Sequence, residues 1–487
     1  MKKVISLLLV FLFLMGAVSC QKKEEPSTPT MEVTFESSEQ GSVLPDKNWE
    51  NRDLRVFINQ NELVGNIIEN SELTDAVGYE VYCRNMYLSE KYNFNILCTE
   101  MVNAECPAQK VVNEAALGES SYDLILDSVT DMKGALAQFV FADLAGMNYI
   151  DWNAKGWLRE ANDSLDILGY RYVCTGDANL YEKSGAVLMY YNRTLLAQIT
   201  TEDVRQLALD GNWTMEKMAE LIKLGSTINS DTGEVSVYGI THPTNEAFYN
   251  YLLTGYGMEI VTKDQDGNLS YAFDEGSTME RTIKAIDEIL KFYCDEETTY
   301  NQRYKQTTPK AETFFLQNRS LFQPNMLCMM KTWRDAGIDY GFLPLPKADA
   351  NMEKYGSAYY TEDTQFFAIP FYAADHDFSA FALQALMENS GNLIHVYVEN
   401  QCKIRGSYDQ EDYDLITMAL DNFIYDLGNV FNWGAIKTWI FVDRYDGNQE
   451  LQSIPVAGVN NLVRNWESKK DLAYKEMYDF LMHFAQA

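Results

Sequence analysis

Short apolar runs rich in β-branched and aromatic residues alternate with segments of helical period along most of this chain. The apolar runs predict strands at Leu54–Ile58, Phe94–Leu97, Tyr122–Leu126, Gly185–Tyr191, Tyr238–Ile240, Gly341–Lys347 and Gln365–Pro370. The segments of helical period predict helices at Gly78–Tyr92, Ala108–Leu117, Met215–Ile222, Thr278–Tyr293, Asp377–Ser390 and Val459–Phe484. Because strands and helices alternate, the pattern predicts an α/β fold with mostly parallel sheets.

Several of these helices carry more detailed expectations. In the segment 78–92, large apolar side chains fall on one face, which we expect to be buried: Tyr79, Tyr82, Met86 and Leu88. Thr214 stands before the helix at 215–222 and is a suitable N-cap, because its hydroxyl can accept from an unpaired backbone N–H. Gly391 is expected to close the helix at 377–390.

The segment Asp264–Asn268 lies between two apolar runs and predicts a hairpin turn. It lacks the series of acidic residues that an EF-hand requires, so we interpret it as a turn and not as a calcium site.

The N-terminus predicts export. Lys2 and Lys3 precede an apolar run over 4–15, and four small residues at 16–19 lead to Cys20. This pattern resembles the lipobox of bacterial lipoproteins, which implies an acylated Cys20, a signal peptide at 1–20 and attachment to the extracytoplasmic face of the cell membrane. Residues 21–49 are polar and predict a flexible tether. The alternative is ordinary cleavage near Ser19, which leaves a free cysteine.

Composition excludes some partners. The chain of 487 residues has a formal net charge of −32, whereas nucleic-acid binding requires clustered Lys and Arg, so we expect no nucleic-acid partner. Of 8 cysteines, most lie inside apolar runs and none forms a CxxC pair, which predicts buried free thiols. The 4 histidines are scattered. We therefore expect no metal and no cofactor.

Motifs in order along the chain resemble the extracellular solute-binding proteins of family 1, the capture subunits of ABC importers. The matching segments are Tyr122–Ile125, Val187–Arg193, Gly211–Glu216, Leu321–Phe322, Asp339–Lys347 and Phe367–Pro370. The resemblance covers residues 53–487 and implies a two-lobed periplasmic-binding-protein fold of type II, with a hinge between the lobes. It places lobe one at 50–180 plus 358–425 and lobe two at 181–357 plus 426–487.

In such a fold, ligand contacts come from loops at the carboxyl ends of strands. The candidate contacts are Asp127, Ser128, Thr130, Tyr249, Tyr251, Gln323, Asn325, Tyr360 and Trp433. Carboxylates, amides and hydroxyls pair with sugar hydroxyls, and aromatic rings stack on sugar C–H faces. The alternative for Asp127 is a solvated loop acid, and for the two tyrosines at 249 and 251 it is helix packing. Trp433 is expected to stack on a sugar ring, because Asn432 and Gly434 flank it, whereas Trp213 is expected to be a core residue.

The resemblance implies a monomer that captures a small solute, a sugar or oligosaccharide, and delivers it to ABC permease subunits. We expect no enzymatic activity, because no nucleophile elbow or HExxH motif is present. Two alternatives stay open: a membrane-anchored enzyme acting on glycans, and a sensor subunit that presents its ligand to a membrane kinase.

Overall fold

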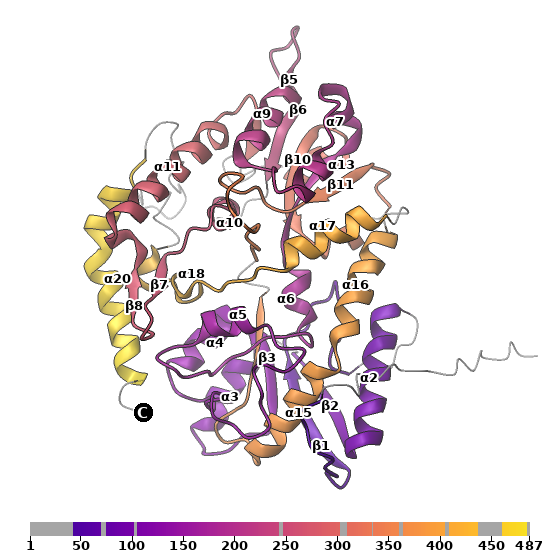
Figure 1. The fold of residues 1–487 in the computed structure, drawn as a ribbon, viewed down its shortest axis with the longest axis vertical. Coiled ribbons are helices and arrows are strands. Elements are labelled where there is room, and N and C mark those ends of the chain that lie inside the picture. The colour runs from indigo at the N-terminus through magenta and orange to yellow at the C-terminus, as the bar shows by residue number, and fades with distance from the viewer. Residues whose placement is uncertain are drawn as a thin grey trace, which may run out of the picture. The chain divides into compact units, whose positions relative to one another are not determined.

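The computed structural model describes residues 42–69, 75–101, 105–242, 247–301, 309–333, 335–359, 364–404, 409–436 and 460–484 (Figure 1). The predicted signal peptide at 1–20, the lipidation residue Cys20, most of the tether at 21–49 and the candidate residue Tyr360 lie outside these ranges. The helices are α2 (Ala76–Tyr92), α3 (Pro107–Ala115), α4 (Val129–Leu136), α5 (Arg159–Leu165), α6 (Leu180–Ser184), α7 (Arg193–Ile199), α8 (Val204–Leu209), α9 (Met215–Gly225), α10 (Ala247–Gly255), α11 (Gly276–Tyr293), α13 (Ala311–Leu316), α14 (Met329–Trp333), α15 (His376–Glu388), α16 (Gly391–Ile404), α17 (Gln410–Leu420), α18 (Leu427–Phe431) and α20 (Leu462–Phe484), with the 3-10 helices η1 (Ala272–Asp274) and η2 (Trp433–Ala435).

The first sheet has the strand order β12-β3-β1-β2. Its strands are β1 (Arg52–Ile58), β2 (Phe94–Glu100), β3 (Leu124–Ser128) and β12 (Gln365–Ala368). β1 pairs in parallel with β2 and β3, whereas β12 runs antiparallel to β3. In this register Gln365 pairs with Ser128. The carboxyl ends of β1 and β3 therefore meet the first residue of β12 at one edge of the sheet.

The second sheet has the order β11-β4-β10-β6-β5, and β9 also pairs with β6. Its strands are β4 (Val187–Asn192), β5 (Thr227–Ile228), β6 (Val235–His242), β9 (Thr299–Asn301), β10 (Ser320–Met326) and β11 (Tyr340–Leu343). β6 is parallel to β9 and β10, so the carboxyl ends of these three strands share an edge. The separate strands β7 (Val261–Lys263) and β8 (Leu269–Tyr271) form a hairpin, which confirms the turn predicted at 264–268.

The sheets are mixed, and the expectation of mostly parallel sheets is wrong in that detail. β4 runs antiparallel to β10 and β11, and β12 runs antiparallel to β3. An apolar run predicts that a strand is buried but carries no information about its direction. The α/β class itself is confirmed.

Two expectations about helices are corrected. The buried face of α2 contains Val77, Val81, Arg84 and, as expected, Leu88, whereas Tyr82 and Met86 are exposed. Periodicity predicted another face because it counts arginine as a surface residue and tyrosine as a core residue, whereas Arg84 is buried and Tyr82 is exposed. In addition, α15 ends at Glu388 and Gly391 begins the next helix, α16.

Other helix predictions are confirmed. The Thr214 side chain accepts from Lys217 N at the start of α9, as expected for an N-cap. Trp213 is fully buried and its Nε1 donates to Pro344 O at 2.9 Å. This tryptophan therefore belongs to the core.

α17 contacts elements around both sheets. It packs on α16, which in turn packs on α2 near the first sheet, and it also packs on β11 and α8. Arg193 Nη2 donates to Asp412 Oδ1 at 3.0 Å, and Arg205 Nη1 donates to Asp409 Oδ2 at 2.9 Å. The assignment of 358–425 to lobe one stays a prediction, and its C-terminal end is tied to α7 and α8 of the predicted second lobe.

Among the cysteines in the described ranges, Cys83, Cys174 and Cys328 are buried as expected, whereas Cys98, Cys106 and Cys294 are only half-buried. None of the described helices has both the length and the apolarity needed to cross a bilayer.

Candidate functional site

The carboxyl edge of the first sheet brings together Asn59, Asp127 and Gln365. Asn59 directly follows β1, and its backbone N–H donates to Leu126 O at 2.9 Å. Its side-chain Nδ2 donates to Asp127 Oδ1 at 3.1 Å. Gln365 Nε2 donates to the Asn59 backbone oxygen at 2.5 Å. Asn59 is thus held by β3 and by the first residue of β12.

Asp127, predicted as a ligand contact, is fully buried at the end of β3. Its carboxylate accepts from Ala108 N and from Ser128 N, each at 2.8 Å, in addition to Asn59. Burial raises its pKa to about 6, and these three donors act against that shift. Because both oxygens already have donors, the carboxylate holds the first turn of α3 and the side chain of Asn59.

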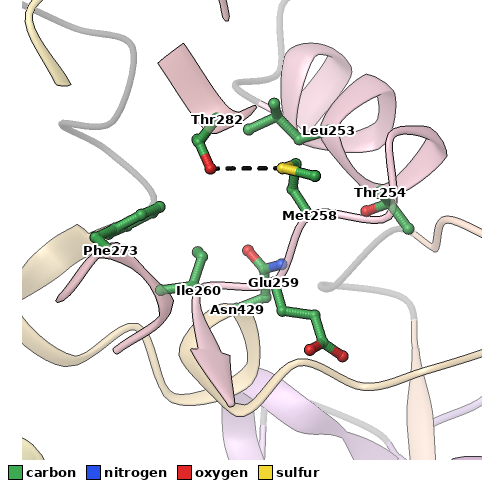
Figure 2. A pocket seen from close by; sticks show the side chains of 8 residues that line it. All are labelled: Leu253, Thr254, Met258, Glu259, Ile260, Phe273, Thr282 and Asn429. Carbon is green, nitrogen blue, oxygen red and sulfur yellow. Dashed lines mark hydrogen bonds between the residues drawn. The ribbon is translucent and has the colours of Figure 1, made fainter. Parts of the chain in front are cut away.

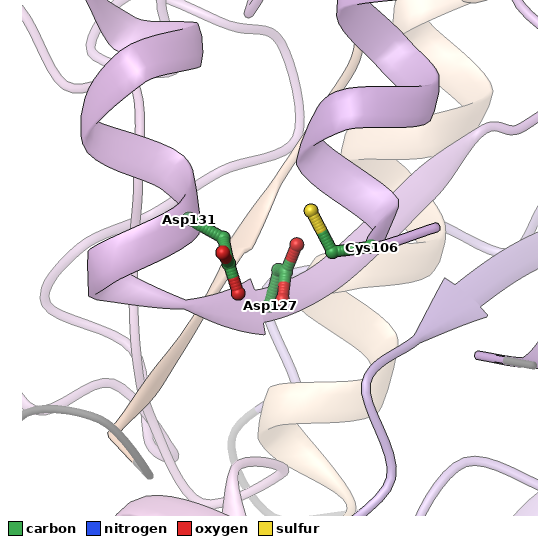
Figure 3. Close-up of side chains that lie close together, drawn as sticks. All are labelled: Cys106, Asp127 and Asp131. Carbon is green, nitrogen blue, oxygen red and sulfur yellow. The ribbon is translucent and has the colours of Figure 1, made fainter. Parts of the chain in front are cut away.

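Cys106, Asp127 and Asp131 lie close together, with one potential metal-ligand atom of each within 4.8 Å of the others (Figure 3). Burial raises the pKa of the Cys106 thiol to about 11, so it stays protonated at neutral pH. The hydrogen bonds at the starts of α3 and α4 explain the cluster without an ion.

Ser128 and Thr130, also predicted contacts, differ in position. Ser128 is the N-cap of α4: its hydroxyl accepts from Asp131 N at 3.2 Å and donates to Asp131 Oδ2 at 2.8 Å. Thr130, in the first turn of α4, is exposed. Of these two side chains, Thr130 is the one that a solute can reach.

The carboxyl edge of the second sheet also carries buried polar side chains. The Thr241 hydroxyl on β6 donates to Gln323 Oε1 at 2.5 Å, and its oxygen lies 3.0 Å from Ser320 Oγ. Asn325, two residues further along β10, donates to Glu312 Oε1 at 3.4 Å. The predicted contacts Gln323 and Asn325 lie within β10 and not in a loop after it, Gln323 at the middle of the strand and Asn325 near its carboxyl end.

The loop that follows β1 is tied to several elements through its backbone oxygens. Lys331 Nζ on α14 donates to Leu63 O at 2.9 Å, and the Tyr181 hydroxyl on α6 donates to Gly65 O at 2.8 Å. Buried Arg84 on α2 donates to Ile67 O at 2.9 Å and to Ile68 O. Burial lowers the pKa of Arg84 to about 10, which leaves it charged at neutral pH. The loop beside Asn59 is thereby fixed in place.

Tyr251 on α10 is buried, so the structure favours the packing alternative for it; the side chain of Tyr249 lies outside the described residues. Near the end of α10 a small pocket is lined by the eight residues of Figure 2: Leu253, Thr254, Met258, Glu259, Ile260, Phe273, Thr282 and Asn429. The space available to the centre of a water molecule there is about 10 Å³, room for about one water. A sugar ring does not fit in this pocket.

The expectation that Trp433 lies outside the core is wrong. Its ring is 6% exposed and stacks on Phe431, with ring centroids 4.9 Å apart and an angle of 12° between planes. Phe480 of α20 covers it at 5.5 Å. The prediction relied on the polar neighbours Asn432 and Gly434. These two residues adopt left-handed backbone conformations, so their presence reflects the geometry of the turn and not exposure to solvent.

Asn59 and Gln365 were missed by sequence reasoning. Both positions could have been found by asking which polar residues directly flank a predicted strand at its ligand-facing end. In the sequence, Gln365 begins one apolar run and Asn59 directly follows another.

No profile of a known protein family and no curated protein sequence matches this chain. Solved structures do share its fold. An ABC substrate-binding protein from Listeria monocytogenes in complex with cycloalternan is 11% identical, with a TM-score of 0.52, over 88% of this chain and 99% of that one. A cyclo/maltodextrin-binding protein complexed with maltotetraose is 14% identical, with a TM-score of 0.50, over 90% of this chain and 98% of that one. The resemblance seen in the sequence is thus confirmed at the level of the fold: this chain has the two-lobed α/β fold of the ABC solute-binding proteins.

Proposed function

We propose that the protein captures a neutral carbohydrate between its two sheets and releases it chemically unchanged. The observation that carries this proposal is the fold, which is shared along 99% of a substrate-binding protein solved in complex with cycloalternan. A second binding protein of this fold was solved with maltotetraose.

The polar groups at the two carboxyl edges fit a neutral ligand. Asn59 and Gln365 at one edge, and Thr241, Gln323 and Asn325 at the other, supply amides and hydroxyls. These groups can donate to and accept from sugar hydroxyls, and none of them carries the positive charge with which Arg or Lys binds an anion. The formal net charge of −32 also disfavours an anion.

Transport is the role in which such capture is useful. We propose that lipid on Cys20 holds the protein on the extracytoplasmic face of the membrane, and that the loaded monomer delivers its sugar to ABC permease subunits. The lipobox-like sequence that ends at Cys20 supports the anchor. Detergent-phase partitioning of the wild type and of Cys20→Ser tests it, since equal membrane recovery of both would remove the anchor from the proposal.

Two measurements distinguish capture from catalysis: the thermal stability of the protein with each sugar, and the chemical integrity of the sugar after incubation. A thermal-shift screen of neutral mono- and oligosaccharides, maltotetraose and cycloalternan among them, should identify ligands. A sugar at one hundred times its dissociation constant adds about 2.7 kcal/mol of stability. Chromatography of the same sugars after prolonged incubation should recover them intact. Shortened or rearranged products would instead support the alternative of a glycan-active enzyme.

A further inference from the structure

In the side-chain amide of Gln365, the nitrogen has a hydrogen-bond partner and the oxygen has none among the described residues. Its Nε2 donates to the Asn59 backbone oxygen at 2.5 Å. Its Oε1 is shut off from solvent and accepts no hydrogen bond from any residue in the described ranges, although the residue is only 4% exposed. A buried acceptor without a donor costs free energy, so its retention calls for a reason.

The orientation of this amide is fixed by its neighbours. Turning it over would bring Oε1 against the Asn59 carbonyl, where two acceptors repel, so the oxygen has to point away from β1. The backbone around it is also held: Asn179 Nδ2 donates to Gln365 O at 2.7 Å and to Thr175 Oγ1 at 3.0 Å. The oxygen is therefore presented in one direction by a rigid support.

We infer that Gln365 is a ligand-contacting residue whose Oε1 accepts a hydrogen bond from a hydroxyl group of the carbohydrate. This inference rests on the proposed function and adds to it a specific donor–acceptor contact. Gln365 lies at the carboxyl edge of the first sheet, opposite Ser128 and bonded to Asn59, where α/β proteins bind ligands.

The contact also specifies what the ligand must offer. An amide oxygen accepts and does not donate, so it selects a group that carries a hydrogen, such as a sugar hydroxyl. Solvent does not reach Oε1, so a ligand contacts it only when the edge opens, as hinge motion in two-lobed proteins allows. Removal of a ligand hydroxyl at this position would leave the oxygen unpaired and weaken binding.

The test compares Gln365→Met with Gln401→Met. Both replace a buried glutamine whose Oε1 has no donor among the described residues, but Gln401 lies inside helix α16 and not at the end of a strand. Calorimetry with maltotetraose and with cycloalternan should show at least a tenfold weaker affinity for Gln365→Met. Gln401→Met should bind like the wild type.

Each outcome has a distinct meaning. Wild-type affinity in Gln365→Met would overturn the inference and point to a structural role or a buried water for Oε1, while the proposed function would stand. Failure of the wild type itself to bind any sugar of the panel would overturn both. If Gln365→Met does not fold, Gln365→Asn withdraws the oxygen by one methylene and should show the same weakened binding; unchanged affinity there would likewise overturn the inference.

Discussion

At the scale of single residues, Trp433 packs in the core. The sequence instead predicts that its ring stacks on a sugar, because Asn432 and Gly434 flank it. Its ring lies between Phe431 and Phe480 and is 6% exposed. Trp433→Ala should therefore cost about 3–5 kcal/mol of unfolding free energy, because it leaves a cavity between η2 and α20. A urea melt measures this loss.

Tyr478→Ala provides the control for that melt. Tyr478 lies on the same helix, α20, but is 53% exposed, so its removal should change stability by less than about 0.5 kcal/mol. A Trp433→Ala variant with unchanged stability and much weaker sugar binding would contradict the packing role.

Two buried carboxyls predict an unusual response to pH. Burial raises the pKa of Asp127 and of Asp426 to about 6 each. A carboxyl with a raised pKa stabilises the folded state fully below its ordinary pKa near 4, and that contribution is lost as pH rises through 6. Each carboxyl should therefore contribute about 1.4 kcal/mol more at pH 5 than at pH 7.5.

Urea melts at pH 5 and pH 7.5 test this expectation, and the wild type should be more stable at pH 5. Asp127→Asn is expected to be less stable overall, because its amide would face the N–H groups that the carboxylate now accepts from. The variant should nevertheless show a smaller difference between the two pH values. An unaltered difference in Asp127→Asn would show that Asp127 ionises normally.

At the scale of elements, α2 supports the loop after β1 through one buried arginine. Arg84 donates to Ile67 O, Ile68 O and Ser390 Oγ from a side chain that is 2% exposed. Arg84→Met should cost about 2–3 kcal/mol, because backbone oxygens lose their donor. It should also weaken sugar binding, since the loop lies beside Asn59.

Arg159→Met is the matched control, because Arg159 has a side chain that is 69% exposed and a long contact of 3.7 Å to Asp163. Stability and affinity should both stay at wild-type levels in that variant. If Arg84→Met loses stability but keeps full affinity, the loop does not shape the site.

The elements themselves were largely predictable from the sequence, whereas their faces and directions were not. β1, β2, α9 and α11 appear where apolar runs and helical periodicity place them. The buried face of α2 was missed because burial of Arg84 depends on backbone oxygens of residues 67 and 68, which no local pattern reveals. Antiparallel pairing of β12 with β3 depends on residues more than two hundred positions apart.

The candidate site was predictable only in position. Asp127, Ser128 and Asn325 do lie near the carboxyl ends of strands, whereas Gln323 lies in the middle of β10. Their hydrogen bonds to helix starts and to each other show that a strand-end polar residue can be either a ligand contact or a structural cap. Sequence alone does not distinguish these roles, because the distinction lies in which acceptors and donors are already satisfied in three dimensions.

At the scale of the whole molecule, Lys263 joins the β7–β8 hairpin to α5. Its ammonium donates to Asp163 O at 2.9 Å, to Ser164 O at 2.8 Å and to Asp166 O. These are carbonyls at the C-terminal end of α5, where a positive charge is favoured. Lys263→Met should loosen this connection and speed sugar release at least threefold, as measured by stopped-flow fluorescence.

Lys284→Met is the control for that experiment, since the Lys284 side chain is 79% exposed on α11. Burial lowers the pKa of Lys263 to about 8, while Asp163, Asp166 and Glu259 favour its charged form and Arg171 disfavours it. Release from the wild type should therefore be faster at pH 9 than at pH 7, and this difference should vanish in Lys263→Met. Equal pH dependence in both proteins would contradict the role of this lysine.

Isothermal titration calorimetry of the full chain with neutral oligosaccharides, beginning with maltotetraose and cycloalternan, tests the central claim most directly. We predict saturable binding of one sugar molecule per chain, and recovery of the sugar intact from the calorimeter cell after the titration. Absence of binding across the panel, or steady heat from turnover in place of saturation, would contradict the conclusion that this protein captures a carbohydrate.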